Sequence, residues 1–428
     1  MSTDDRRQSG FKRRTRVDDA RATLLDAFEP HDRTERVRLA VADGRAVARS
    51  LTAPHPVPGY DRAAMDGYAV RASDTIGASD RAPALLTQQA RDSEVAPGGA
   101  VRVHTGSELP AGSNAVVMIE QVTEVGDDLE VFSPVAEGEN VGDTGEDVAK
   151  GQTLYEPGHR LRPSDLGLLK SVGLAEVEVY KPPTVGVIPT GEELVDFDPD
   201  PGEIIETNGL TVSRLAERWG ATPTYRNIVT DEPSALRAAV QRDLTKDIVV
   251  TTGGSSVGER DLIPEVVDDL GEVLVHGVGL KPGHPVALGV VEKTPVLMLP
   301  GYPVACIVNA VQFLRPALKR MGHLPREPVP TREATLARKI ASEPGTRTFA
   351  RVAVDPADGN TAADDAATED ATADNAAASE YRATPTRTSG SGVLSSVALA
   401  DGWVVVPEAR EGYAAGDRVT VEYWEALQ

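Results

Sequence analysis

The sequence has little of what cross-links a chain or anchors it in a membrane. It holds one cysteine, Cys306, so no disulfide can form within the chain, and no Cys/His cluster has the spacing of a zinc site. No apolar run approaches the ~20 residues that a membrane helix needs. Aromatic residues make up 4% of the chain and hydrophobic residues 40%, so the core must be built from Val, Ala, Leu and Ile. These absences predict a protein of a reducing compartment with no membrane segment, and we expect it in the cytoplasm.

Positive charge is also scarce. The chain carries 66 acidic and 44 basic residues, a formal net charge of -22, and only nine of the basic residues are lysines. A field of this sign repels phosphate backbones and anionic membranes, so nucleic-acid binding is not expected. The Lys-poor, acid-rich composition favours a protein kept soluble in concentrated salt, and we hold salt adaptation as a hypothesis.

The length of 428 residues exceeds the roughly 100–200 residues of one typical domain. Within the last quarter, residues 355–380 contain eight acids and ten alanines but no Val, Ile, Leu or aromatic residue, and predict a solvated insert. Ser164 is expected to cap a helix. The expected regions are a disordered tail over 1–17, a discontinuous helical linker domain over 18–55 and 141–181, an inserted β-domain over 56–140, an α/β domain over 182–324, and a β-rich C-terminal domain over 325–428.

Strands and helices alternate through the region 182–324. The pattern predicts strands over 184–188, 222–229 and 247–252, with helices over 204–219 and 233–244 between them. Such alternation implies an open, largely parallel sheet that is covered by helices on both faces. Sheets of this kind bind ligands at the carboxyl ends of their strands.

The most informative loop follows the apolar strand that begins at Asp247. Residues 253–258 read Gly-Gly-Ser-Ser-Val-Gly, and a helix start follows at Asp261. Glycines let the backbone turn its N–H groups toward an anion, and a helix N-terminus adds a favourable field. The loop matches neither the Walker spacing nor the Rossmann spacing. It predicts a phosphate cradle, with a plain tight turn as the alternative.

Two further loops carry cations or turn signals. Lys281 and His284 stand at the two ends of a rigid Pro-Gly turn, where Lys can neutralise an oxyanion and His can donate to one or exchange a proton. An incidental charged turn is the alternative. Pro300 to Pro303 ends an apolar strand and starts a helix with one buried face. Cys306 lies in that helix and is expected to be core.

Acidic residues follow successive strands of the same region. Glu193, Asp231 and Asp261 each come after a predicted strand or loop. Carboxylates beside an anion site make sense if a divalent cation bridges them to phosphate oxygens, or if one of them acts as a general base. Individually, each is more often an N-cap or a solvated charge.

Taken together and in order, these motifs resemble the molybdopterin molybdenumtransferases, the family of MoeA and the gephyrin E domain. The resemblance runs from about Val17 to the C-terminus. The segments that carry it are Met65–Ala69, Thr105–Gly106, Asn114–Val117, Gly145–Asp147, Thr190–Leu194, Gly253–Gly258, Lys281–Pro285 and Pro300–Pro303.

The resemblance implies a fold and a reaction. The fold would be a helical domain made of two segments, an inserted β-domain, an α/β domain of the molybdopterin-adenylyltransferase type (MoaB/MogA-like) and a C-terminal β-barrel. Such proteins are elongated homodimers whose active cleft combines two subunits. The reaction would insert molybdate into adenylylated molybdopterin and release AMP, assisted by Mg²⁺, with the substrate handed over by a molybdopterin adenylyltransferase.

The resemblance also implies roles for individual residues. The motifs place a metal at Asp231 and Asp261. Catalytic roles fall to Asp66, Thr105, Glu193, Asp231, Asp261, Lys281 and His284. Binding of the pterin, its phosphate or the oxyanion falls to Thr190, Gly191, Gly253, Gly254, Ser255, Ser256, Gly258, Gly283, Pro300, Gly301, Pro303, Arg351 and Ser391.

Four positions depart from the family's pattern. His284 stands where a second lysine is usual, Tyr302 where Asn is usual, Ala305 where Ser often follows, and Ser255 where Val or Thr is common. Replacing a fixed cation by His makes oxyanion affinity pH-dependent, and loss of the Ser hydroxyl removes one donor. Two alternatives therefore stay open: a tungstate-inserting paralogue, and a scaffold protein that binds molybdopterin without turnover.

Overall fold

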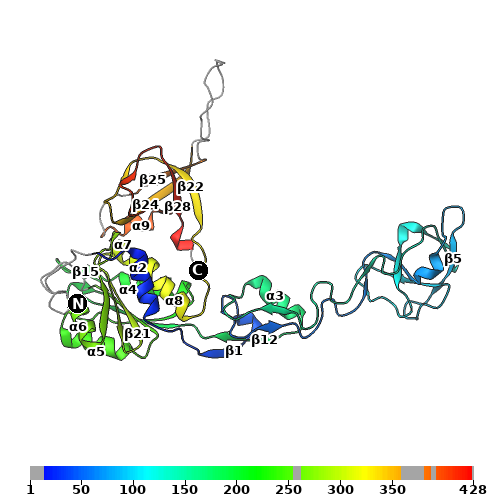
Figure 1. The fold of residues 1–428 in the computed structure, drawn as a ribbon, viewed down its shortest axis with the longest axis horizontal. Helices are drawn as coiled ribbons and strands as arrows, with labels where there is room; N and C mark the ends of the chain where they lie inside the picture. The colour runs from blue at the N-terminus through cyan, green and yellow to red at the C-terminus, as the bar shows by residue number, and fades with distance from the viewer. Residues whose placement is uncertain (1–13, 254–261, 358–379, 387–391, 427–428) are drawn as a thin grey trace, which may run out of the picture. The chain divides into compact units, whose positions relative to one another are not determined.

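The computed structural model describes residues 14–253, 262–357, 380–386 and 392–426. The chain divides into two compact units (Figure 1). Unit 1 takes the residues up to 34 and those from 180 onward, and unit 2 takes residues 35–179. Among the described residues, no helix is long and apolar enough to cross a membrane.

Unit 1 is built on a six-stranded sheet in the order β16-β13-β17-β21-β20-β18. The first four strands are parallel, and β20 runs antiparallel to both of its neighbours. The prediction of a largely parallel sheet is therefore confirmed. The strands are β16 (Thr222–Tyr225), β13 (Thr184–Pro189), β17 (Ile248–Thr252), β21 (Thr294–Leu299), β20 (Ala287–Val291) and β18 (Glu272–His276).

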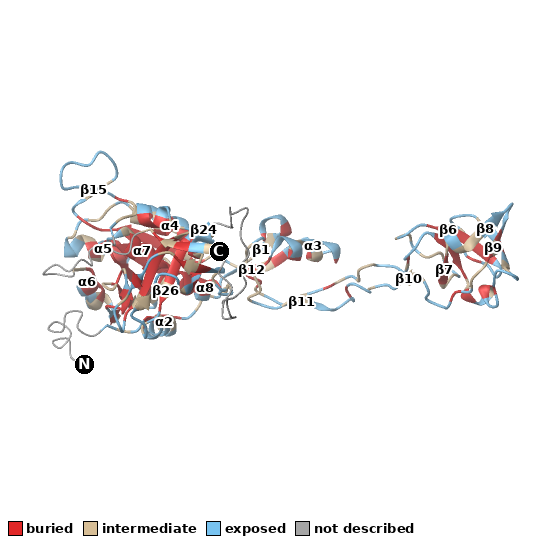
Figure 2. Cartoon of the chain, turned by 90° about the horizontal axis from the view of Figure 1, so that it is seen from above, coloured by how far each residue is buried: buried red, intermediate tan, exposed pale blue. Residues whose placement is uncertain are grey.

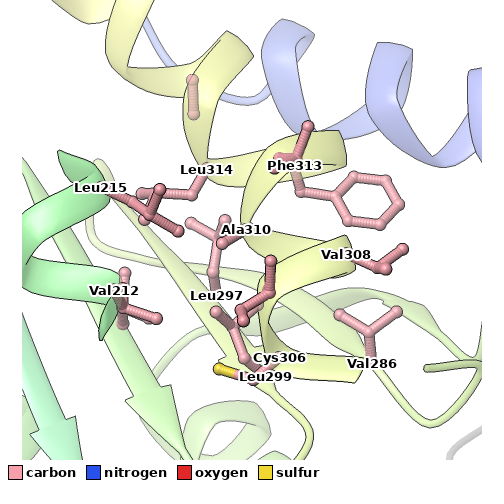
Figure 3. Close-up of a cluster of buried hydrophobic side chains, with 14 of the residues drawn as sticks. Val212, Leu215, Val286, Leu297, Leu299, Cys306, Val308, Ala310, Phe313 and Leu314 are labelled. Atoms are coloured by element: carbon pink, nitrogen blue, oxygen red, sulfur yellow. The ribbon is translucent and has the colours of Figure 1, made fainter. Parts of the chain in front are cut away.

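Helices cover both faces of this sheet, because alternate residues of each strand point to opposite sides. In β17, Val249 packs in the cluster formed with α5 and α6, while Val250 packs in the cluster formed with α4 and α7. Figure 3 shows part of the cluster to which Val250 belongs. In it, Leu215 and Leu297 lie near the buried side chains of the helix that carries Cys306. The helices are α4 (Asn208–Arg218), α5 (Pro233–Asp243), α6 (Leu262–Leu270), α7 (Pro303–Asn309) and α8 (Arg315–Met321), with the π-helical turn η4 (Ala310–Leu314) between the last two.

The N-terminal helix α2 (Val17–Asp26) differs from its expected place. Val17 was expected in the tail and the rest in the helical linker domain, yet Val17, Ala20 and Leu24 are fully buried in the core of unit 1. Their spacing of three and four residues sets all three on one helix face, and that face packs on the α/β core rather than on unit 2. Figure 2 shows buried residues inside unit 1 and also inside the β-sheet of unit 2.

Two helix starts also differ from the sequence-based expectation. The helix expected over 204–219 begins at Asn208, because Ile204–Ile205 form the short strand β15 beside β14 (Leu194–Val195). In unit 2, α3 (Pro163–Ser171) begins one residue before Ser164. The side chain of Asp165 accepts the backbone N–H of Arg162 at 2.9 Å, so this pair, and not Ser164, closes the helix start.

The C-terminal part of unit 1 closes into a five-stranded barrel. Its strands follow the order β24-β25-β22-β28-β26, and β26 pairs back onto β24. The acidic insert joins β24 to β25, but its first residues, Asp355 and Pro356, still pair within the barrel, and residues 358–379 lie outside the described chain. The barrel strands are β24 (Arg347–Pro356), β25 (Tyr381–Pro385), β22 (Thr331–Leu336), β28 (Arg418–Glu422) and β26 (Gly402–Val406).

Unit 2 combines a β-sheet with a small helical region. The sheet has the order β7-β4-β6-β5-β9-β8, and its strands are β7 (Ala115–Met118), β4 (Gly67–Val70), β6 (Gly99–Val103), β5 (Ala84–Gln89), β9 (Asp128–Val131) and β8 (Val122–Val125). The helical region packs α3 against Leu39, Val47 and Val179. Short pairs complete this unit: β1 (Thr34–Arg38) with β12 (Glu176–Tyr180), β2 (Leu51–Thr52) with β11 (Thr153–Tyr155), and β3 (Arg62–Ala63) with β10 (Val141–Gly142).

Candidate functional site

A cavity of about 930 Å³ opens in unit 1 at the carboxyl ends of β13, β17 and β21. Its other wall comes from the barrel, through residues of β24. The predicted site residues that the structure brings together around it are Thr190, Glu193, Asp231, Gly253, Lys281, Gly283, His284, Pro300, Gly301, Pro303 and Arg351. The expectation that ligands meet this edge of the sheet thus has a matching cavity.

The floor of the cavity is made of backbone that leaves no room for side chains. Gly253 has φ +125°, and a Cβ atom there would lie 2.0 Å from the carbonyl oxygen of Thr190. Hydrogen bonds lock the three strand ends together: the N–H of Thr190 donates to Thr252 O and the N–H of Gly253 donates to Leu299 O, both at 3.1 Å. Glycine is therefore required at 253, and a ligand can approach the backbone closely.

Two carboxylates face this floor. Asp231 is half-buried, and its Oδ1 atom is buried with no hydrogen-bond partner among the described residues. Burial, and then the nearby negative charge of Glu193, raise the pKa of Asp231. The hydroxyls of Thr190 and Thr252 are also buried without partners in the described part of the chain. Because buried polar groups in folded proteins are nearly always satisfied, this cluster has the chemistry of a ligand site.

Sequence reasoning missed a third carboxylate in the cavity. Glu206 is buried, accepts the backbone N–H of Gly209 at 2.7 Å and accepts a hydrogen bond from the Tyr225 hydroxyl. Burial and the Glu206 carboxylate raise the pKa of Tyr225. Asn208 next to it donates from Nδ2 to Gly301 O at 2.7 Å. The sequence does show an acidic residue just before the start of a helix, three positions before Gly209. Such a residue predicts only an ordinary hydrogen bond to the backbone of the first helical turn.

The cationic loop is held from below by a buried amide. Asn309 donates from Nδ2 to Gly283 O at 2.9 Å and to Ala305 O at 2.8 Å, which fastens the loop to α7. Lys281 is half exposed, with Nζ 3.3 Å from Glu343 Oε1. Burial, and then the charge of Arg14, lower the pKa of His284. At neutral pH the loop therefore offers one fixed cation and one neutral imidazole.

The barrel adds a buried cation and apolar surface. Arg351 is 3% exposed and lies on β24 with Thr348 and Phe349, which the sequence had not singled out. Tyr302 lies at the mouth, 59% exposed, and an added Cβ on Gly392 would lie 3.3 Å from its ring.

Cys306 is buried, and burial raises the pKa of its thiol, so the expectation that it is core is confirmed.

Some predicted site residues do not line this cavity. Gly191 uses its N–H to bind Val229 O at 3.1 Å. Asp66 and Thr105 belong to unit 2, where the N–H and hydroxyl of Thr105 donate to Asp66 Oδ1 at 2.7 and 3.1 Å and lower its pKa. The predictions at Gly254, Ser255, Ser256, Gly258, Asp261 and Ser391 lie outside the described residues.

Comparison with known proteins decides the family. Residues 15–173 match the "MoeA N-terminal region (domain I and II)", residues 186–320 a "Probable molybdopterin binding domain", and residues 372–424 the "MoeA C-terminal region (domain IV)". A molybdopterin molybdenumtransferase of Bacillus subtilis is 33% identical over 92% of this chain and 90% of its own length. The chain belongs to the molybdopterin molybdenumtransferase family.

Other members of the family agree with this assignment. The molybdopterin molybdenumtransferase of Haemophilus influenzae is 35% identical over 71% of this chain and 77% of its own. The crystal structure of a molybdopterin biosynthesis MoeA protein from Pyrococcus horikoshii matches with a TM-score of 0.78 and 31% identity, covering 96% of this chain and all of that one. The family places this chain in molybdenum cofactor biosynthesis, and the α/β residues that line the cavity, from Thr190 to Ala305, lie within the matched molybdopterin-binding domain.

Proposed function

We propose that this chain inserts molybdate into adenylylated molybdopterin and releases AMP. The observation that carries the proposal is a single cavity lined by the cations Lys281 and Arg351, the carboxylates Glu193 and Asp231, and a backbone floor at Gly253. A substrate with a pyrophosphate and an incoming oxyanion needs this combination of positive charge, donors and carboxylates.

The residues present fit Mg²⁺ as an assisting cation. Asp231 has a buried oxygen without a partner in the described chain, and the charge of Glu193 acts on it. Magnesium at phosphate sites is held by one or two carboxylates together with substrate oxygens, so two acids suffice; among the described residues no group of three metal-binding side chains occurs. Glu193 and Asp231, with Asp261 by motif, would hold the ion. Bound there, it supplies positive charge to the phosphate oxygens.

The protein's own side chains would divide the remaining work. Lys281 and Arg351 bind the anionic groups, and the Thr190 and Thr252 hydroxyls donate hydrogen bonds beside the Gly253 backbone. Asn309 orients the Lys281 loop through Gly283. Water breaks the P–O–P bond, so that AMP leaves with one phosphate and the pterin keeps the other as its ester. The loop 254–258, with Gly254, Ser255, Ser256 and Gly258, would hold that ester.

The assembly is part of the same proposal. A homodimer would let Asp66 and Thr105 of one subunit face the cleft of the other, and a molybdopterin adenylyltransferase would hand over the substrate. The formal net charge of -22 supports a cytoplasm of high salt as the setting.

The test is AMP release from adenylylated molybdopterin by the purified chain with Mg²⁺, with molybdate and tungstate added separately. Oxyanion-dependent release is expected, and the half-saturating concentrations of the two oxyanions identify the metal. Tight binding of the pterin without release would overturn the transferase and favour the scaffold, for which Ala305 and His284 are the specific observations.

A further inference from the structure

The first described residues of the chain lie beside the loop that carries Lys281 and His284. The N–H of Thr15 donates to Gly277 O at 3.1 Å, and the N–H of Gly279 donates to Thr15 O at 2.8 Å. Thr15 and Val278 thereby form a parallel bridge. Thr15 thus pairs alongside residues 277–279 like a short parallel strand. Gly279, the last of these residues, precedes Lys281 by two positions.

Neighbouring contacts fix this segment on both sides. Asp18 forms a two-pronged ion pair with Arg347, at 3.0 and 2.6 Å. The backbone N–H of Arg347 in turn donates to Gly279 O at 2.8 Å. The helix that follows the segment is buried through Val17. The backbone position of residue 14 is therefore set by the fold and not by chance contact.

Arg14 precedes this bridge and stands next to the cationic loop. Its Cβ lies 4.0 Å from the place where a Cβ on Gly279 would be, so the base of the Arg14 side chain is a neighbour of the segment that leads into the loop. Arg14 is exposed, and its charge acts on His284 strongly enough to lower the pKa of that imidazole. Glu343, which also pairs with Lys281, acts on His284 in the opposite direction.

We propose that Arg14 supplies the second fixed positive charge of this loop and positions the anionic group of the substrate there. The inference rests on the proposed function. A neutral His284 leaves Lys281 as the only constant charge among the loop residues 281–285, and Glu343 offsets part of it. A guanidinium stays protonated at any working pH, so it can attract a tetrahedral oxyanion or a phosphate where an imidazole does not.

The expected size of the effect follows from distance and screening. Arg14 stands beside the loop and is not among the residues that line the cavity, so its charge would act through partly solvated space and is expected to change the affinity for a doubly charged anion by about 3- to 10-fold at low salt. The loss of affinity should become smaller as the ionic strength rises, because salt screens the charge of Arg14. A loss of affinity caused by disturbed packing would not depend on salt in this way.

The experiment measures binding of sodium molybdate and, separately, of AMP to the full chain by calorimetry at low and high salt. Arg14→Gln is expected to weaken one or both anions about 3- to 10-fold at low salt, and Arg14→Lys to keep most of the affinity. Loss for molybdate alone assigns the oxyanion to Arg14, and loss for AMP alone assigns the phosphate. Arg16→Gln is the matched control, since Arg16 is exposed and its charge acts on Asp18.

A rescue makes the test specific. In the Arg14→Gln background, His284→Lys is expected to restore the lost affinity, because it returns a fixed cation to the loop. Unchanged binding in Arg14→Gln, or an equal loss in Arg16→Gln, would overturn the role of Arg14 while leaving the transferase untouched. A wild-type chain that releases no AMP and binds neither anion would instead overturn the proposed function, and this inference with it.

Discussion

Asp165 in unit 2 and Asp231 in unit 1 both have buried carboxylate oxygens. Those of Asp165 accept hydrogen bonds, whereas Oδ1 of Asp231 has no partner among the described residues. Asp165 accepts the backbone N–H, Nε and Nη2 of Arg162, the Tyr155 hydroxyl at 3.0 Å and a ring N–H of His159 at 2.8 Å. Burial alone would raise the pKa of Asp165, but these hydrogen bonds together lower it far below its usual range. Asp231 has a raised pKa and an oxygen without a partner in the described chain.

The contrast separates an acid whose oxygens the fold satisfies from one whose oxygen it leaves without a partner among the described residues. Asp165 fixes the positions of Arg162, Tyr155 and His159 through its hydrogen bonds. Burial, and then the hydrogen bond to this carboxylate, raise the pKa of Tyr155 to about 12. Asp231 costs stability in the folded protein unless a ligand or proton satisfies it. Both residues look alike in the sequence, where each is an acid near a helix start.

Removal of the charge at Asp165 is expected to have the largest effect. Asp165→Asn removes the charge from a buried carboxylate that accepts several hydrogen bonds, and should lower the free energy of unfolding of unit 2 by about 2–3 kcal/mol. Denaturant unfolding followed by far-UV circular dichroism measures this loss. The three tryptophans, Trp219, Trp403 and Trp424, all lie in unit 1, so their fluorescence should show an unchanged transition.

The exposed Asp43 of unit 2 provides the matched control for this substitution. Asp43→Asn should change the unfolding free energy by less than about 0.5 kcal/mol. Equal free energies of unfolding for the Asp165→Asn and Asp43→Asn variants would contradict the comparison, because the charge of Asp165 would then not stabilise unit 2.

Acid should reduce the difference in stability between wild type and Asp165→Asn. The folded pKa of Asp165 is lowered, so its stabilisation is fully present above the unfolded pKa of about 3.9 and is lost as the pH falls from there toward the folded value. Unfolding of both proteins at several pH values from 7 to 2.5 measures this. A gap that stays constant to pH 2.5 would contradict the assigned hydrogen bonds.

Asn309 combines both situations in one side chain. Its Nδ2 atom is satisfied by Gly283 O and Ala305 O, while its Oδ1 atom is buried without a partner among the described residues. Asn309→Ala should destabilise unit 1 by about 1–3 kcal/mol, because the donor to Gly283 is lost. Tryptophan fluorescence during unfolding measures it, with the exposed Asn227→Ala as the control. Identical midpoints for the two variants would show that the loop needs no anchor.

The smallest expected effect on stability is that of Asp231→Asn. A raised pKa means that the ionised carboxylate destabilises the folded protein at neutral pH, so the neutral amide should stabilise unit 1 slightly. Thermal unfolding without Mg²⁺ measures it. A loss as large as that of Asp165→Asn would mean that Asp231 is structural.

Much of the fold could be predicted because its signals are local. Turn residues after apolar strands marked the strand ends near Thr190, Gly253 and Pro300, and Pro303 marked the start of α7. The packing of α2 on the α/β core could not be predicted, because an apolar helix face does not by itself say which core buries it. That choice is made by tertiary contacts such as the pair between Asp18 and Arg347.

The site could be predicted only where a motif names a residue. Lys281 and Asp231 were predicted in this way, and the structure places both on the cavity, while their roles stay a prediction. Glu206 was missed, because its importance comes from Tyr225, which lies 19 positions further along the chain. The contribution of Phe349 depends on closure of the barrel onto the α/β part, which no local pattern reveals.

The most direct test of the functional acid is the single-turnover rate of AMP release by Asp231→Asn, compared with wild type at saturating molybdate and Mg²⁺. With the fold intact, the rate is expected to fall at least about 100-fold, because the proposed function loses a carboxylate of the cavity that would face the reacting phosphates. A variant that releases AMP as fast as the wild type would contradict the assignment of Asp231 to the reaction.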